Sequence, residues 1–196
     1  MENVITELKN IINIGKLESY TFNLKDLPNY SDYKLDIRKH KEFTKIFSSL
    51  NEKANDCLYW FSTDNEKDTT FLKKEIEVYR EALKNRKDIR VVPAKNTNLN
   101  SSVIYVGVRK GGARSFTRIN NKRVEDRLTH IEGRIIQHLG YYKKGTTQGV
   151  QFVHWAKDCN IEVTLNVIEF QESTNQFLYI IEKLHAIKLK PILGKH

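Results

Sequence analysis

The sequence predicts an α+β fold with a small central β-sheet, mixed or antiparallel, that is flanked by helices and preceded by a helical N-terminal extension. Short segments rich in β-branched and aromatic residues alternate with longer segments whose apolar residues recur at helical spacing. The chain has 196 residues, 39% of them hydrophobic and 29% charged, which suits a globular domain that buries its own core. We expect the extension to span residues 1–52 and the main domain to span 53–196.

The composition argues against a membrane protein and against a disulfide framework. No apolar run approaches the roughly 18 residues of a membrane span, and residues 1–7 lack the basic start of a signal peptide. We therefore expect a soluble cytoplasmic protein without a membrane partner. Cys57 and Cys159 lack the spacing of a zinc site or of paired cysteines, so we expect both to be core thiols.

The elements expected in the first half of the chain are mainly helices. Apolar residues at helical spacing predict helices over 2–14 and 39–50, with a loop at 27–31 between them. The short aromatic-rich segment 56–62 predicts a strand. The charged, periodic segment 69–86 predicts another helix.

The middle of the chain combines a strand, a basic segment and a helical pattern. Residues 102–108 predict a strand, and residues 109–121, which contain two adjacent glycines and no periodicity, predict a long basic loop. The segment 122–139 predicts a helix, because its apolar residues are spaced by four, three, four and four. These apolar residues are Val124, Leu128, Ile131, Ile135 and Leu139.

The last elements expected are a strand and a helix. The alternation of apolar residues over 161–170 predicts a strand buried on at least one face. Ser173 and Gln176 resemble a capping box that opens a helix reaching about Leu189, and Pro191 ends it.

Positive charge is concentrated in one part of the chain. The formal net charge is +9, and residues 101–150 hold 10 Lys and Arg against 3 Asp and Glu. A solvated basic face is the simpler interpretation, but the rest of the chain is nearly charge-balanced, which favours a surface that faces nucleic acid. Five basic residues also run beside the apolar stripe of the 122–139 helix and predict a cationic ridge. They are Arg123, Arg127, His130, Arg134 and His138.

Several short motifs occur in a recurrent order around this helix. Tyr59 follows Cys-Leu in the first predicted strand, and Tyr105 begins Tyr-Val-Gly in the second. Arg134 precedes His138 by one helical turn, and Glu182 lies nine residues before Pro191, the second residue of a Lys-Pro pair. Over residues 57–196, approximately, the order of these motifs resembles that of the GIY-YIG nuclease superfamily, whose small α/β domain carries them in the same order.

The resemblance implies a Mg²⁺-dependent endonuclease that hydrolyses DNA phosphodiester bonds, with Mn²⁺ as another suitable cation. It implies that Glu182 binds the metal and that Tyr59 is the general base, a role that needs a nearby positive charge because tyrosine ordinarily has a pKa of about 10. Arg134 would bind the scissile phosphate, Tyr105 would orient the water or the phosphate, and His138 would contact the phosphate or assist proton transfer. Arg127 competes with Arg134 for the role of essential arginine.

The chain also departs from the superfamily's pattern. Residues 64–100 and 109–121 are insertions, and Gly194 replaces an Asn that usually follows the terminal Pro. Such insertions resemble those of restriction endonucleases, which implies DNA as the partner, a homodimer for double-strand cleavage and a cognate methyltransferase in the same system. The residues expected to contact nucleic acid are Arg109, Lys110, Arg114, Arg118, Arg123, Arg127, Lys143 and Lys144.

Two other functions stay open at this stage. Gly194 and the altered first motif would also suit a nucleic-acid-binding protein with a degenerate, inactive nuclease fold. A structural partner protein without affinity for DNA is the third interpretation. The sequence does not distinguish DNA from RNA as the ligand.

Overall fold

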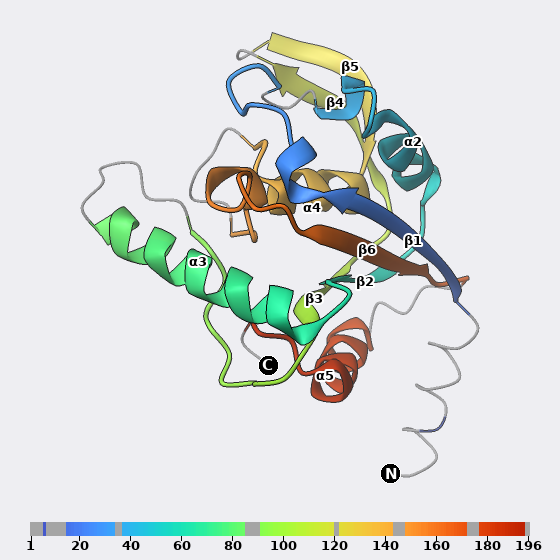
Figure 1. Ribbon diagram of the computed structural model, residues 1–196. Coiled ribbons are helices and arrows are strands. Elements are labelled where there is room, and N and C mark those ends of the chain that lie inside the picture. Colours follow the sequence, from blue (N-terminus) through green and yellow to red (C-terminus); the bar gives the residue numbers. More distant parts are fainter. Residues whose placement is uncertain are drawn as a thin grey trace.

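A four-stranded antiparallel sheet forms the centre of the computed structural model (Figure 1). The structure describes residues 6, 15–33, 37–84, 91–119, 122–142, 148–171 and 177–194, the side chains of residues 117, 119 and 126 excepted. The strand order is β1-β6-β2-β3, so β1 and β3 form the two edges. The strands are β1 (Lys16–Asn23), β2 (Cys57–Ser62), β3 (Val103–Arg109) and β6 (Glu162–Glu169).

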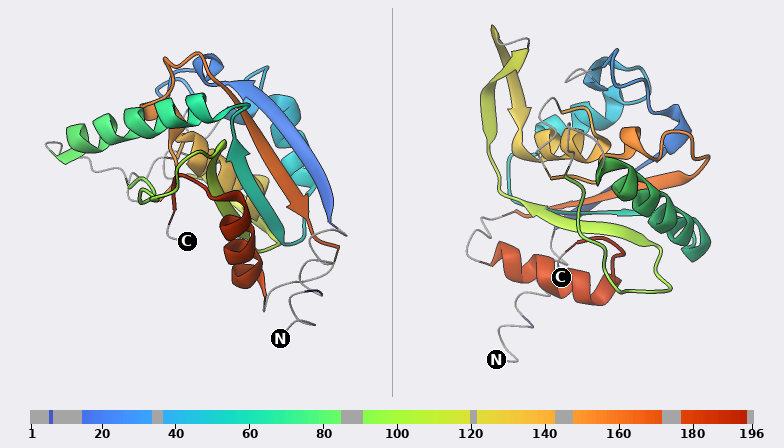
Figure 2. Two further views of the ribbon diagram at one scale, coloured as in Figure 1. Left: turned by 60° about the horizontal axis from the view of Figure 1, so that its bottom comes forward. Right: turned by 90° about the vertical axis from the view of Figure 1, so that its left-hand side faces the viewer.

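Helices cover both faces of this sheet, which makes the protein a mixed α+β domain. Figure 2 shows α4 and α5 on opposite sides of it. The described helices are α2 (Thr44–Glu52), α3 (Glu66–Lys84), α4 (His130–Leu139) and α5 (Leu178–Leu189), with short 3₁₀ turns at Leu24–Asp26, Ile37–Lys39 and Phe152–His154. The expected capping box at residues 173 and 176 lies outside the described residues.

The two faces of the sheet bury two hydrophobic cores, because successive residues of a strand point to opposite sides. Tyr59 and Phe61 of β2 belong to the larger core, which also contains apolar residues of α2 and α4. Leu58 belongs to the smaller core, where it packs with Val106 of β3 and Ile181 of α5. The alternation in β2 therefore directs Tyr59 toward α4.

Several sequence expectations are confirmed. The strands expected over 56–62, 102–108 and 161–170 are β2, β3 and β6, and the helix expected over 69–86 is α3. Cys57 is buried in the core, whereas Cys159 is only half-buried. Among the helices that the structure describes, none is both long and apolar enough to cross a membrane.

Part of the segment expected as a helical N-terminal extension, residues 1–52, is a strand, although α2 lies where a helix was expected over 39–50. Residues 16–23 form β1, which pairs with β6 along its whole length, from Lys16 opposite Glu169 to Asn23 opposite Glu162. Strand pairing explains this outcome, because Tyr20 and Phe22 alternate along β1 and pack against the larger core. Of the helix expected over 2–14, the structure describes only Thr6, which is helical.

Two predictions for the middle of the chain are wrong: the loop over 109–121 and the first half of the helix over 122–139. These residues form a two-stranded antiparallel ribbon of β4 (Ala113–Ile119) and β5 (Lys122–Thr129), and α4 begins only at His130. A spacing of four places residues on one side of a helix and also on one side of a strand, since four is a multiple of two. The steps from Val124 to Leu128 and from Arg123 to Arg127 therefore did not discriminate between the two structures.

A capping signal marks where the ribbon ends and α4 begins. The Thr129 hydroxyl accepts a hydrogen bond from the backbone N–H of Glu132 and donates one to the carbonyl of Leu50 at 2.9 Å. Thr-x-x-Glu is a sequence signature of a helix N-terminus, so this boundary was readable. The cationic ridge expected along one helix is consequently divided between β5 and α4.

Candidate functional site

The site begins with a close approach between β2 and β3. Tyr59 lies directly opposite Gly107 in the antiparallel register. A Cβ atom at Gly107 would lie 2.5 Å from the Tyr59 hydroxyl oxygen and 2.6 Å from its ring carbon Cζ. Gly107 is therefore required because it leaves room for the Tyr59 ring to lie across β3. This is a physical role for the glycine of the Tyr-Val-Gly motif.

Helix α4 brings Arg134 to the Tyr59 hydroxyl. The Arg134 Nε–H donates to this oxygen at 3.1 Å, and Nη2 lies 3.5 Å from the hydroxyl of Tyr105. Nη1 donates to Gln137 Oε1 at 3.0 Å and to the carbonyl of Gln148 at 2.6 Å. The guanidinium has five N–H donors, so these contacts fix its plane, and within the described part of the chain one Nη2–H is left for a ligand.

His138 lies one helical turn after Arg134, on the same side of α4. Its Nδ1 accepts the backbone N–H of Val150 at 3.1 Å, so the ring proton is on Nε2, which is 2.9 Å from the Tyr59 hydroxyl oxygen. The side chain is fully buried, with its ring centroid 4.7 Å from that of Tyr105. Burial and the charge of Arg134 hold the pKa of His138 well below its ordinary value of 6.5. His138 is therefore a neutral, enclosed imidazole that donates to Tyr59.

The Tyr59 hydroxyl thus accepts hydrogen bonds from two sides. The residue has 0% exposure. Burial raises its pKa above the ordinary value of 10 despite the opposing effect of Arg134. A proton-accepting role at neutral pH requires a lowered pKa and access for water, and this geometry supplies neither. It supports a role for Tyr59 in holding Arg134.

Glu182 interacts with this group electrostatically from an element on the other face of the sheet. It lies on α5, which packs against the opposite face, and β3 between them is an edge strand. The half-buried carboxylate interacts electrostatically with Arg134 and with both tyrosines. Burial raises the pKa of Glu182 from 4.5 to about 7, and Arg134 opposes this rise. Burial likewise raises the pKa of Tyr105.

The donor set near Glu182 fits one kind of metal site. Its carboxylate makes no hydrogen bond or ion pair with any residue that the structure describes, so its oxygens are available. No group of three or more His, Cys, Asp or Glu among those same residues could enclose a metal. Mg²⁺ and Mn²⁺ accept such a sparse protein contribution, because water and phosphate oxygens complete their coordination.

Arg109 adds a second cation beside Arg134. Tyr105, Gly107 and Arg109 alternate along β3 and therefore share one face of the sheet. The Arg109 Nε atom is buried and has no hydrogen-bond partner among the described residues. Burial and then the charge of Arg134 lower the pKa of Arg109. Two neighbouring guanidinium groups of this kind form a site that favours an anion.

None of the other described cationic residues expected to bind nucleic acid forms a hydrogen bond with Tyr59, Tyr105 or His138. Lys110 is exposed beyond the end of β3. Arg127, the competing candidate for the essential arginine, is exposed on β5, whereas Arg134 contacts both tyrosines. Lys143 and Lys144 lie outside the described residues. Four of the predicted residues are exposed on the ribbon of β4 and β5: Arg114, Arg118, Arg123 and Arg127.

Gly194 occupies a backbone conformation that favours glycine. Its φ is 121°, in a region that residues with side chains rarely adopt, and its N–H donates to the carbonyl of Ala94 at 2.8 Å. The preceding Leu193 forms bridges with Tyr105 and Lys95. The backbone here therefore explains why a glycine stands at this position.

Some residues of the site were not identified from the sequence. Gln137 and Gln148 hold Arg134, and the backbone N–H of Val150 sets the tautomer of His138. Gln148 and Val150 contribute through the backbone, which carries no residue-specific signal. Gly107 stood within the recognised motif, and its close contact with Tyr59 became visible only from the pairing of β2 with β3.

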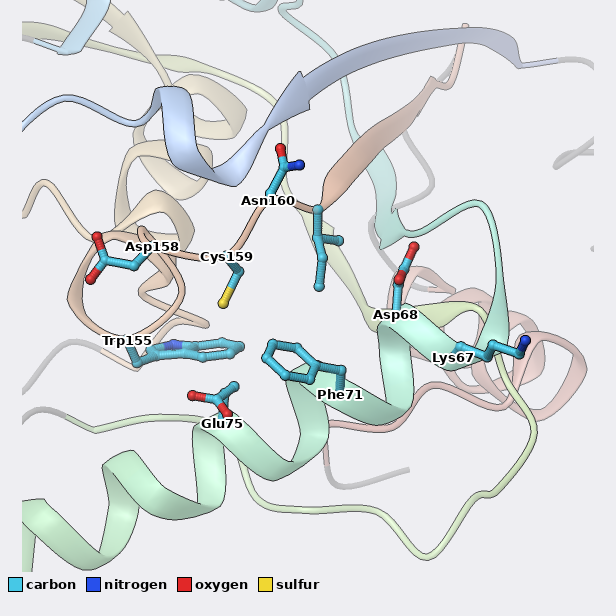
Figure 3. Close-up of a pocket in the computed structure, with 9 residues that line it drawn as sticks. Lys67, Asp68, Phe71, Glu75, Trp155, Asp158, Cys159 and Asn160 are labelled. Carbon is cyan, nitrogen blue, oxygen red and sulfur yellow. The ribbon is translucent and has the colours of Figure 1, made fainter.

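A separate cavity of about 610 Å³ lies between α3 and the segment 155–161 (Figure 3). Phe71 and Trp155 face one another across it. Three carboxylates and one lysine line it, so it repels rather than attracts a polyanion. The charged residues are Lys67, Asp68, Glu75 and Asp158.

Comparisons of the sequence with protein-family models and with curated proteins, and of the fold with solved structures, found no match for this chain. The functional proposal therefore depends on the residues of the site and on their geometry.

Proposed function

We propose that this protein is a Mg²⁺-dependent DNA endonuclease of the GIY-YIG type, and specifically an enzyme of the restriction type. One observation carries the proposal. The Tyr59 hydroxyl lies within hydrogen-bond distance of both Arg134 and His138, although 75 residues separate Tyr59 from Arg134 in the sequence. Four of the residues that resemble the superfamily's motifs, Tyr59, Tyr105, Arg134 and His138, therefore form one contiguous group, and Glu182 interacts with Arg134 and both tyrosines electrostatically.

The chemistry of phosphodiester hydrolysis needs stabilisation of negative charge at the phosphorus oxygens. Arg134 is suited to this because its guanidinium is permanently charged and its plane is fixed by four contacts. A donor that is already oriented spends little energy on reorganisation when the substrate binds. The remaining Nη2–H of Arg134 is the group assigned to the scissile phosphate.

Tyr59 and His138 are positioning residues in this proposal. His138 is fully buried and uses both ring nitrogens within the protein, so it has no access to a phosphate. Its proton on Nε2 fixes the orientation of the Tyr59 hydroxyl, which in turn receives Arg134. Tyr105 is less buried, and its hydroxyl is the one assigned to orient the attacking water.

Glu182 is the residue assigned to the divalent cation. When bound, the cation would neutralise charge on the phosphate and supply a water of lowered pKa. Glu182 itself has to be ionised to bind it. Its pKa of about 7 predicts that metal affinity rises with pH up to roughly neutral values.

A second candidate is an inactive nucleic-acid-binding protein with the same fold. Gly194 favours it, since this residue provides no side chain where the superfamily has an Asn. The exposed basic residues of β4 and β5 serve either function equally.

Cleavage of plasmid DNA in the presence of Mg²⁺ or Mn²⁺ tests the proposal. Wild type should convert supercoiled plasmid to nicked or linear DNA, and EDTA should prevent it. Glu182→Gln should abolish the reaction, and Arg134→Gln should slow it by about a hundredfold or more. Glu42→Gln, which changes an exposed carboxylate away from the site, is the matched control and should cut like wild type.

The two candidates differ in one result. Retained DNA binding without metal-dependent cutting, on DNA of diverse sequence, would reject the nuclease and support the inactive binder. The same plasmid digests, mapped by sequencing, would give the cleavage positions and the number of strands cut.

A further inference from the structure

The β4–β5 ribbon, residues 113–119 with 122–129, stands clear of the main sheet (Figure 2). Leu128 and Thr129 are buried at its base, Leu128 in the larger core, and its other described side chains are exposed or half-buried. A two-stranded ribbon gains little stability of its own in water. The chain nevertheless places five cationic and two acidic residues in it.

The base of the ribbon is fixed to the domain. The Gly111 N–H donates to Asp56 Oδ1 at 2.7 Å, and the Gly112 N–H donates to the carbonyl of Ala54 at 2.7 Å. A Cβ atom at Gly111 would lie 2.6 Å from the carbonyl oxygen of Ala54, so only glycine permits this approach. On the other strand, Thr129 bonds to Leu50. The ribbon therefore has a defined direction relative to the site.

The outer part of the ribbon opposes two positive charges. Arg118 and Arg123 are directly opposite in the register, so they share one face of the ribbon. Like charges in this arrangement are destabilising. Neither arginine forms an ion pair with a carboxylate in the described part of the chain. The Arg123 guanidinium lies 4.0 Å from the centre of the Phe116 ring, a contact that orients it.

A line of cations joins the ribbon to the site. Arg109 interacts electrostatically with Arg114 at the ribbon's base and with Arg134 in the site. Along the chain, the ribbon follows β3, which carries Tyr105, and precedes α4, which carries Arg134. One polyanion could therefore contact both regions at the same time.

We propose that the β4–β5 ribbon enters the major groove of duplex DNA and that Arg118 and Arg123 contact base edges there. The major groove of B-DNA is about 12 Å wide and admits a two-stranded β-ribbon, and arginine is the commonest side chain that reads guanine. The deep, narrow major groove of double-stranded RNA does not admit one. This inference rests on the proposed function only for the position of the ribbon relative to the cleaved bond.

The length of the ribbon limits that position. Strand β4 has 7 residues, which at about 3.4 Å per residue span about 24 Å. At about 3.4 Å per base pair, the ribbon extends along at most about seven base pairs of duplex from its base.

Fluorescence anisotropy with a labelled DNA duplex, without divalent cations so that no cutting occurs, tests the inference. The variant is Arg118→Gln with Arg123→Gln, and the matched control removes two exposed lysines elsewhere, Lys25→Gln with Lys74→Gln. The ribbon variant should lose about tenfold in affinity for each lost base contact. The control should bind like wild type.

Two further measurements separate groove binding from general charge attraction. Dimethyl sulfate modifies guanine N7 in the major groove, so wild type should protect some guanines that the ribbon variant leaves reactive. The melting temperature of the ribbon variant should equal or slightly exceed that of wild type, because the change removes an opposed charge pair. A merely structural pair would instead give a lower melting temperature.

The outcomes distinguish this inference from the proposed function. Equal binding by wild type and the ribbon variant would overturn the inference even if the protein cuts DNA. Absence of guanine protection, or equal affinity for double-stranded RNA, would also overturn it. Ribbon-dependent DNA binding without Mg²⁺-dependent cutting would support the inference and reject the nuclease.

Discussion

The contact between Gly107 and Tyr59 gives the sharpest test of the site. Gly107→Ala would place a Cβ atom 2.5 Å from the Tyr59 hydroxyl oxygen, 2.6 Å from its Cζ and 2.9 Å from Tyr105 Cε1. Tyr59 is fully buried and cannot move toward solvent. Overpacking of this kind typically costs about 1–3 kcal/mol in the free energy of unfolding. For a chain of this size, that corresponds to a melting temperature lowered by roughly 2–12 °C.

The assay is urea denaturation followed by tryptophan fluorescence and circular dichroism. Gly133→Ala is the matched control, since its Cβ would lie 3.5 Å from Leu128 Cδ2, an ordinary contact. Gly133 lies within α4, so this change should stabilise the protein by about 0.5–1 kcal/mol. The two identical substitutions therefore have opposite expected signs.

The Tyr59→Phe change tests whether the ring itself causes the strain. In the Gly107→Ala background it should restore little stability, because the ring carbon Cζ remains within 2.6 Å of the new methyl group. Cleavage should fall in Gly107→Ala, since displacement of Tyr59 releases Arg134. A Gly107→Ala protein with the stability of wild type would refute the proposed close packing.

Three further predictions concern the hydroxyl of Tyr59, the start of α4 and the carboxylate of Glu182. Tyr59→Phe alone leaves the buried donors of Arg134 and His138 without this acceptor. The free energy of unfolding, measured by urea denaturation, should fall by about 1–3 kcal/mol. Tyr179→Phe, at an exposed site, should change it little. Thr129→Ala removes the N-cap of α4 and the hydrogen bond to Leu50, so it should lower the free energy of unfolding by about 0.5–2 kcal/mol in thermal denaturation. Thr129→Ser retains the hydroxyl oxygen and should retain most of this stability. Burial raises the pKa of Glu182 from 4.5 to about 7, so between these pH values the folded state retains a proton that the unfolded chain loses. Without divalent cations, the stability of wild type relative to Glu182→Gln should therefore fall as the pH rises through this interval. A parallel pH dependence of the two proteins would contradict the assigned burial of Glu182.

The sequence by itself determined the strands β2, β3 and β6 and the placement of Arg134 and His138 on one side of a helix. Alternating apolar residues specify which face of a strand is buried, and a spacing of four residues within a helix specifies a common side. These are local properties, so they are visible in a short window of residues. The start of α4 was equally local, because Thr129 and Glu132 form a capping signature.

Only the tertiary structure decided how these elements form a site. The pairing of β2 with β3 places Tyr59 over Gly107, and the packing of α4 brings Arg134 to the Tyr59 hydroxyl. The pKa of Glu182 depends on burial, which no local pattern specifies. The β4–β5 ribbon was missed because a spacing of four fits both a helix and a strand, and long-range pairing decides between them.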